Sequence, residues 1–216
     1  YIASLNYHYK YDQKKYLEIC KKFDVSFKLK VEEFRKPEKD NLRIKIGFLS
    51  ADFKKHSVSL FLEEIINKLN KNDFELVSFS NLQNANQDET TENLKKIFES
   101  WYDISDLSDE ESIKVARSAN LDILIDLSGY TYRNRINLIR ARCAPIQISW
   151  LGYCNSLGVK NIDYIIADPN LIKKSEHNFY SEKVLYMPKI WNALAIPNNL
   201  PKILNLNIED QTFTFG

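Results

Sequence analysis

Glycine, cysteine and long apolar runs are scarce in this chain of 216 residues, which holds five glycines and three cysteines. The cysteines Cys20, Cys143 and Cys154 form an odd, widely spaced set without a CxxC pair, which argues against a disulfide framework and a thiolate zinc site. No apolar run approaches the roughly 20 residues that span a bilayer, and the first residues do not resemble a signal peptide. We therefore expect a cytoplasmic protein that does not enter a membrane.

An excess of charge of one sign is also missing, because 30 Lys and Arg residues face 29 Asp and Glu residues. This balance gives no electrostatic reason to expect nucleic acid or an anionic membrane as a partner. The absence of GxGxxG, GxxxxGK[ST] and GxSxG argues against a dinucleotide site, a P-loop NTPase and an α/β-hydrolase. An initiating Met is missing as well, and the last residues, TFTFG, read as part of a strand, so we expect both ends to be cuts in a longer protein.

Strand and helix patterns alternate from residue 42 onward. Short apolar runs predict strands at residues 43–50, 74–80, 101–104, 122–127, 146–150 and 162–167. Helical spacing predicts helices at residues 57–69, 90–98, 109–119 and 133–140. This alternation is typical of an α/β fold with a mostly parallel sheet and flanking helices. An amphipathic helix at residues 11–27 and a polar linker at residues 28–41 precede it.

Three loops at residues 50–57, 128–134 and 151–158 follow predicted strands and hold three of the five glycines. Ligands of open parallel sheets collect at such carboxyl ends, where helix N-termini point their free N–H groups. His56 lies in the first loop and is suited to proton transfer or to hydrogen bonding with a phosphate or sugar oxygen. The alternative is that His56 only packs at the helix start, where Ser57 is expected to be the cap. His8 and His177 lie in polar segments that we expect to be exposed.

Other polar and aromatic residues near these loops have structural alternatives. Asp122 and Asp126 bracket an apolar strand, and pairing with an Arg or a backbone N–H is the favoured account for Asp126. Trp150 and Tyr153 are suited either to stacking on a ligand or to core packing. The residues 81–87 read as a polar loop. A basic helix suited to phosphate binding or to forming a solvated face is predicted from Arg133, Arg135, Arg140 and Arg142.

Five segments in order resemble the catalytic region of the O-linked N-acetylglucosamine transferases and the related SPINDLY proteins. They are IKIGFLSADFKKHSVS (residues 44–59), DILIDLSGYT (122–131), RCAPIQISWLGY (142–153), NIDYIIAD (161–168) and YSEKVLYMP (180–188). SLNYHY (4–9) is similar to the segment that follows the tetratricopeptide repeats of bacterial members. The resemblance implies a GT-B glycosyltransferase of family 41, with two Rossmann-like domains and the active site between them.

The resemblance also implies a division of the chain and of its chemistry. Residues 1–41 would follow tetratricopeptide repeats, residues 42–205 would form the N-terminal catalytic domain, and residues 206–216 would begin the nucleotide-binding domain. Such enzymes transfer a sugar with inversion, and without a metal or other cofactor, from a UDP- or GDP-sugar to protein Ser or Thr hydroxyls. N-acetylglucosamine from UDP-GlcNAc is the expected sugar. The fragment alone is expected to be inactive.

The same resemblance carries over individual site residues. His56 matches the active-site histidine on the sugar and acceptor side, in the role of base or acceptor-orienting group. The donor-sugar pocket would be lined by Gly129, Tyr130, Thr131, Leu151, Gly152 and Tyr153.

One segment departs from the family pattern. Where the family has PGTSG or PGTTG after WLGY, this chain has CNSLG at residues 154–158, and the loss of the Pro-Gly pair changes the freedom of the backbone. A non-catalytic relative that binds a protein partner is therefore the alternative hypothesis. An isolated flavodoxin-like binding domain is a third, which leaves the five matched segments unexplained.

Overall fold

A computed structural model describes residues 1–29, 32–36 and 42–194 of the chain. Its strands are β1 (Ile44–Ser50), β2 (Phe74–Ser80), β3 (Ser100–Asp103), β4 (Ile123–Asp126), β5 (Ile146–Ser149), β6 (Tyr164–Ala167) and β7 (Lys183–Tyr186). Its helices are α1 (Ile2–Leu5), α2 (Gln13–Val25), α3 (Ser57–Ile66), α4 (Glu89–Ile97), α5 (Asp109–Ser118) and α6 (Ile136–Ala141), with 3₁₀ turns η1 (Asn84–Asn86) and η2 (Lys174–Phe179).

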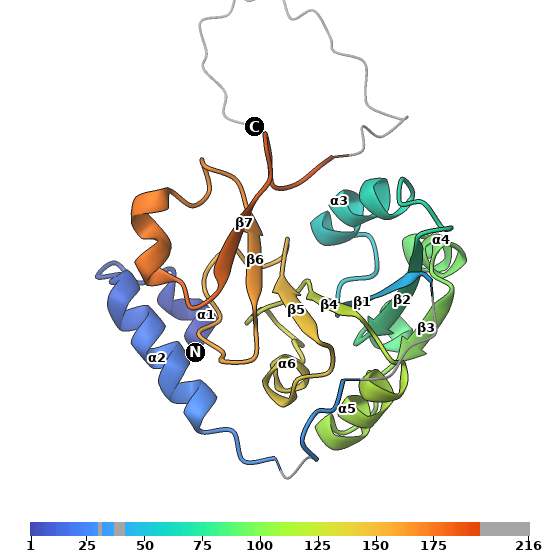
Figure 1. The fold of residues 1–216 in the computed structure, drawn as a ribbon, viewed down its shortest axis with the longest axis horizontal. Helices are drawn as coiled ribbons and strands as arrows, with labels where there is room; N and C mark the ends of the chain where they lie inside the picture. Colours follow the sequence, from blue (N-terminus) through green and yellow to red (C-terminus); the bar gives the residue numbers. More distant parts are fainter. Residues whose placement is uncertain (30–31, 37–41, 195–216) are drawn as a thin grey trace, which may run out of the picture.

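The described strands form one parallel sheet in the order β3-β2-β1-β4-β5-β6-β7 (Figure 1). This is a Rossmann-like order, in which the chain builds outward from β1 in one direction and then from β4 in the other. The predicted fold class is confirmed. The six strands predicted between residues 43 and 167 are all present, whereas β7 was not predicted from its short pattern. The strand expected at the TFTFG end lies outside the described residues.

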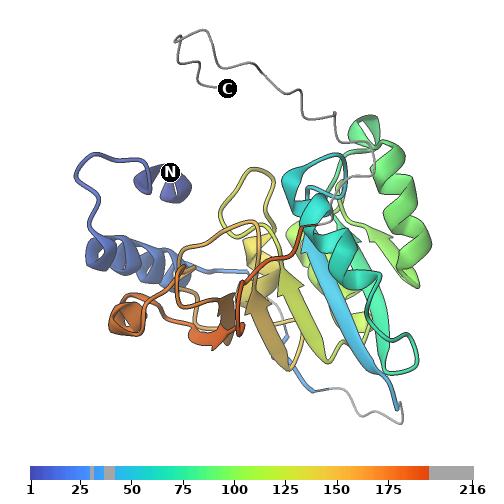
Figure 2. The same ribbon diagram turned by 90° about the horizontal axis from the view of Figure 1, so that it is seen from above.

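Helices cover both faces of the sheet (Figures 1 and 2). On one face, apolar residues of α3 and α4 such as Leu62 and Leu94 pack with Phe48 of β1. On the other face, residues of α5 and α6 such as Ile113 and Ile139 pack in a second cluster. Successive residues of β4 enter opposite clusters, as the period of two in a strand requires.

Side-chain caps fix where the longer helices begin. Asp88 accepts a hydrogen bond from the backbone N–H of Thr91 at the start of α4, and Ser108 accepts one from Glu111 at the start of α5. Both helices carry a capping box, which satisfies N–H groups that a helix leaves free at its first turn. Asp12 caps α2 by accepting a hydrogen bond from the backbone N–H of Lys15, without a capping box.

The N-terminal helices pack on the edge of the sheet domain. Tyr16 and Cys20 of α2 are 2% and 0% exposed and belong to the same apolar cluster as α5 and α6. The guanidinium of Arg140 lies over the rings of Phe23 and Phe27 and donates to the carbonyl of Phe23. The division of the chain at residues 41 and 205 stays a prediction, and residues 206–216 lie outside the described residues.

Candidate functional site

The candidate site lies where the strand order reverses. β1 and β4 are neighbours in the sheet, and the chain continues to β2 on one side of them and to β5 on the other. Open α/β sheets bind ligands at the carboxyl ends of the strands at such a switch point. The loop after β1 carries His56, and the loop after β4 carries residues 128–134, so the sequence-predicted loops meet here.

His56 is the N-cap residue of α3. Its backbone is extended (φ −152°), and its Nδ1 accepts a hydrogen bond of 3.2 Å from the backbone N–H of Val58. The prediction that Ser57 is the cap is therefore wrong, because the imidazole takes that role and Ser57 is the first helical residue. Capping does not exclude a functional role for His56, since the other ring nitrogen, Nε2, is not used by the cap.

The cap hydrogen bond also determines which of the two ring nitrogens of His56 carries the hydrogen. A backbone N–H can only donate, so Nδ1 must be the unprotonated nitrogen of a neutral ring, and Nε2 then carries the hydrogen. In this state His56 offers a donor at Nε2 rather than a proton acceptor. The carboxylate Oδ2 of Asp52 lies 4.0 Å from Nδ1, the nitrogen that accepts the cap hydrogen bond.

Two cavities adjoin each other at this edge of the sheet. The first has a volume of about 290 Å³ and is lined by His56, Thr131 and Gly152 among the predicted residues. The second, of about 510 Å³, is lined by Tyr153 together with Thr131 and Gly152. Since Thr131 and Gly152 line both, the two cavities share a wall. The second is bounded on its far side by residues of the N-terminal segment, including Asn6 and Tyr11.

Gly129 and Gly152 are required by the backbone geometry of these walls. A Cβ on Gly152 would lie 1.9 Å from the carbonyl oxygen of Leu127, and one on Gly129, which has φ +54°, would lie 2.4 Å from Cβ of Tyr153. Neither contact is possible without moving a loop, so the close approach of the loops after β4 and β5 depends on both glycines.

Three of the predicted residues, Gly129, Tyr130 and Leu151, line neither cavity, and Tyr153 lines only the second. Gly129 packs against Tyr153, as described above, and Leu151 is 6% exposed in the apolar cluster of the α3 face. Tyr130 donates from its hydroxyl to the carbonyl of Leu157 at 2.5 Å. The contacts of these residues are structural ones that position the loops.

Tyr153 lies in a buried polar network. Its hydroxyl lies 2.6 Å from that of Tyr16 and accepts a hydrogen bond of 2.7 Å from the side-chain amide of Asn6. The altered loop at residues 154–158 is held in turn by Glu182, whose carboxylate accepts hydrogen bonds from the hydroxyl of Ser156 and the N–H of Leu157. The segment at residues 154–158, which departs from the family pattern, is therefore held in place by specific hydrogen bonds.

Asp126 fixes the start of the loop after β4. Its carboxylate is 2% exposed and accepts hydrogen bonds of 3.1 Å and 2.9 Å from the backbone N–H groups of Ser128 and Gly129. The pairing favoured from the sequence is confirmed. Burial raises the pKa of Asp126 to about 6, and the two N–H groups act against that shift.

The prediction of a basic helix at residues 133–140 is wrong in two respects, the residues that the helix spans and the exposure of its arginines. α6 begins at Ile136, because Arg133 has φ +56° and Arg135 is the N-cap residue. Arg135, Arg140 and Arg142 are bound to carbonyls and carboxylates inside the fold, so they form neither a phosphate-binding helix nor a solvated face. Sequence spacing alone could not show this, since the partners lie far away along the chain.

The sequence did not single out several residues that line the cavity with His56. Asp52 and Lys54 belong to the loop that was identified, whereas Gln83 and Asn86 lie in the segment read as a plain polar loop. Arg133, which the sequence analysis assigned to a basic helix, lines the same cavity. These residues could have been found from their positions directly after β1, β2 and β4, since the carboxyl ends of these strands meet at one edge of the sheet.

The remaining predictions concern histidines, cysteines and metals. His8 and His177 are exposed as expected, and the cysteines are unpaired, with Cys20 and Cys143 buried and Cys154 exposed. Within the described ranges, no group of three His, Cys, Asp or Glu residues is placed to hold a metal ion. None of the helices in that part of the chain has the length and apolar character needed to cross a membrane.

The family of the chain follows from a match with a family model. The model for glycosyl transferase family 41 matches residues 10–208. The chain belongs to glycosyl transferase family 41. This match spans all of the loops that surround the candidate site.

The chain also matches the sequences of individual curated proteins. The chain is 26% identical over 183 residues to SEC of Arabidopsis thaliana, named "Probable UDP-N-acetylglucosamine--peptide N-acetylglucosaminyltransferase", covering 81% of this chain and 19% of SEC. It is 32% identical over 137 residues to SPINDLY of the same plant, whose printed name gives the same activity. This match covers 60% of this chain and 15% of SPINDLY. The chain thus spans less than a fifth of the curated relatives it matches.

A comparison with solved structures confirms the fold. An O-GlcNAc transferase mutant of Thermobaculum terrenum matches with a TM-score of 0.78 and 25% sequence identity, covering 94% of this chain and 38% of that protein. The Rossmann-like sheet is therefore one part of a larger structure in that relative.

Proposed function

We propose that the chain is the N-terminal half of the catalytic region of an inverting glycosyltransferase that acts on protein Ser and Thr hydroxyls. The proposed donor is UDP-GlcNAc, and no metal or other cofactor is required. The proposal rests on one observation above all, the cavity at the switch point that brings His56, Thr131 and Gly152 together in a chain of family 41. The names of SEC and SPINDLY support the choice of donor and acceptor.

In the proposed reaction the acceptor hydroxyl oxygen attacks the anomeric carbon of the donor sugar. A new carbon–oxygen bond forms, the bond to the diphosphate breaks with its electron pair leaving on the nucleoside diphosphate, and the hydroxyl proton is released. Positioning of the two substrates supplies much of the rate in such a transfer. A second domain, which residues 206–216 would begin, would bind the nucleotide and complete the site.

The role proposed for His56 follows from its cap. With Nδ1 accepting from Val58, Nε2–H is available to orient the acceptor or a sugar oxygen. A base role would require the proton to move to Nδ1, near Asp52, at the expense of the cap hydrogen bond. The acceptor-orienting role is therefore the one that the local geometry supports better.

The test compares His56→Ala and His56→Asn in the full-length protein. Alanine removes both the imidazole and the cap, whereas asparagine is a good N-cap residue and removes only the imidazole. We expect both variants to lose transfer activity by about 10²-fold, as loss of substrate positioning does, while His56→Ala alone loses about 1 kcal/mol of stability. Wild-type turnover in His56→Asn would refute the role of the imidazole.

Donor binding separates the proposal from its alternative. Thermal-shift titration with UDP, GDP, UDP-GlcNAc and GDP-fucose should show stabilisation by the UDP pair, about 2.7 kcal/mol at 100 times the Kd. No stabilisation by any of the four, together with no transfer, would favour a non-catalytic relative that binds a protein.

A further inference from the structure

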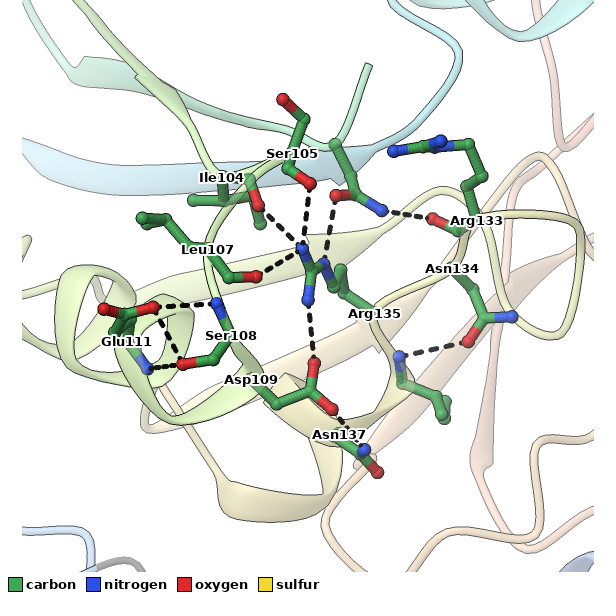
Figure 3. A network of polar contacts seen from close by, with 12 residues as sticks. Ile104, Ser105, Leu107, Ser108, Asp109, Glu111, Arg133, Asn134, Arg135 and Asn137 are labelled. Carbon is green, nitrogen blue, oxygen red and sulfur yellow. Dashed lines mark hydrogen bonds and ion pairs between the residues drawn. The ribbon is translucent and has the colours of Figure 1, made fainter. Parts of the chain in front are cut away.

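Arg133 differs from the other arginines of its segment, because its guanidinium has no partner among the residues that the structure describes. Its Nε is buried without a hydrogen-bond partner among the described residues, and no ion pair there involves its side chain. By contrast, the guanidinium of Arg135 donates to Asn81 Oδ1, Asp109 Oδ1 and the carbonyl of Ile104 at 2.7–3.0 Å. In Figure 3 no dashed line reaches the guanidinium of Arg133, whereas several reach that of Arg135.

The backbone of Arg133 is held in a conformation that a side chain disfavours. Its φ of +56° lies in the left-handed region, which is unfavourable for a residue with a Cβ. The side-chain amide of Asn81 donates to the carbonyl of Arg133 at 2.6 Å, and Asn81 is itself held by Arg135 and through it by Asp109 (Figure 3). A strained residue that its surroundings hold in place points to a function.

The cavity that Arg133 lines is electropositive. Its charged lining residues are Lys54, Arg133 and Asp52, two cations and one anion. Neither Lys54 nor Arg133 forms an ion pair within the described part of the chain. α3 also begins here at His56, and a helix N-terminus adds partial positive charge. An anion would therefore find unpaired donors and a favourable potential in this cavity.

We propose that Arg133, assisted by Lys54, binds an anionic oxygen group of a substrate beside His56, and that Asn81, Arg135 and Asp109 position it. The ligand chemistry is a phosphate or carboxylate group, which a guanidinium binds through charge-assisted hydrogen bonds. The identification of the ligand as a substrate rests on the proposed function. Two sources share this chemistry, the diphosphate of the donor and an acidic side chain next to the acceptor hydroxyl.

The first experiment is calorimetric titration of the full-length protein with inorganic pyrophosphate. Arg133→Gln should weaken pyrophosphate binding about tenfold, since a hydrogen bond to a charged group contributes at least that much. The control Arg35→Gln removes an exposed arginine whose neighbours Asn120 and Leu121 precede β4, at the opposite end of the strands. It should leave binding unchanged. Equal binding by wild type and Arg133→Gln, or no binding by wild type, would overturn the proposal.

A second variant keeps the test independent of folding. Glycine adopts a φ of +56° without strain, so Arg133→Gly should not lower the unfolding temperature even though it removes the guanidinium. Loss of pyrophosphate binding in this stable variant would support a binding role. Normal pyrophosphate binding in Arg133→Gly would contradict it.

Kinetics then distinguish the two sources. If the anion is the donor diphosphate, Arg133→Gln should bind the nucleotide sugar about tenfold more weakly than wild type. The variant should then modify acceptor peptides with Asp or with Asn beside the serine at equal rates. If it is an acceptor carboxylate, donor affinity should stay unchanged and a wild-type preference for the Asp peptide should disappear in the variant. An inactive wild-type protein would refute the proposed transferase, whereas the pyrophosphate titration still decides whether Arg133 binds an anion.

Discussion

Replacing Asp126 with asparagine should change how the stability of the protein depends on pH. The carboxylate is buried at the start of the loop after β4, with a pKa raised to about 6 from its ordinary value of 3.8. A carboxyl group that holds its proton more tightly in the folded state stabilises the fold below pH 4. That stabilisation is lost as the pH rises through about 6.

The magnitude follows from the size of the shift. A difference of about 2 pKa units corresponds to about 3 kcal/mol, at 1.36 kcal/mol per unit. The free energy of unfolding of wild type should therefore fall by about that amount between pH 4 and pH 7, relative to Asp126→Asn, which does not titrate. All other groups titrate in both proteins, so the difference between the two isolates Asp126.

The assay is urea denaturation of both proteins at pH 4, 5, 6 and 7. The asparagine oxygen can still accept one of the two N–H groups of Ser128 and Gly129, so a constant offset of about 1 kcal/mol is expected at every pH. Only the change of the difference with pH tests the reasoning. Parallel stability curves from pH 4 to pH 7 would show that burial does not govern the ionisation of Asp126.

Two further substitutions test how the site is held. Gly152→Ala should destabilise the protein by about 3 kcal/mol in urea denaturation, because its Cβ would meet a backbone carbonyl 1.9 Å away. Gly47→Ala, whose Cβ meets only side chains, at 2.6 Å or more, should cost less, and equal losses would contradict this account. Arg140→Met should speed hydrogen exchange in α2 but not in β4, with a loss of about 2 kcal/mol, since the guanidinium binds the carbonyls of Phe23 and Asp24. Unchanged exchange in α2 would refute the role of Arg140 in docking that helix.

The sequence by itself determined the fold class and indicated which loops form the candidate site. The alternation of apolar runs and helical patterns gave an α/β sheet because strand and helix periodicities are local properties. Carboxyl ends of parallel strands meet at one edge, so the loops that carry His56 and Thr131 could be brought together without coordinates. The order of the five family segments then indicated the kind of enzyme.

The tertiary structure decided what individual side chains do. His56 rather than Ser57 caps α3. Of the four arginines in one short segment, three have partners inside the fold, whereas the guanidinium of Arg133 has none within the described ranges. These outcomes depend on contacts between residues far apart along the chain, such as Arg140 with Phe23. Local spacing carries no information about such partners, and burial, which sets the pKa of Asp126, exists only once the loops after β1, β4 and β5 have packed together.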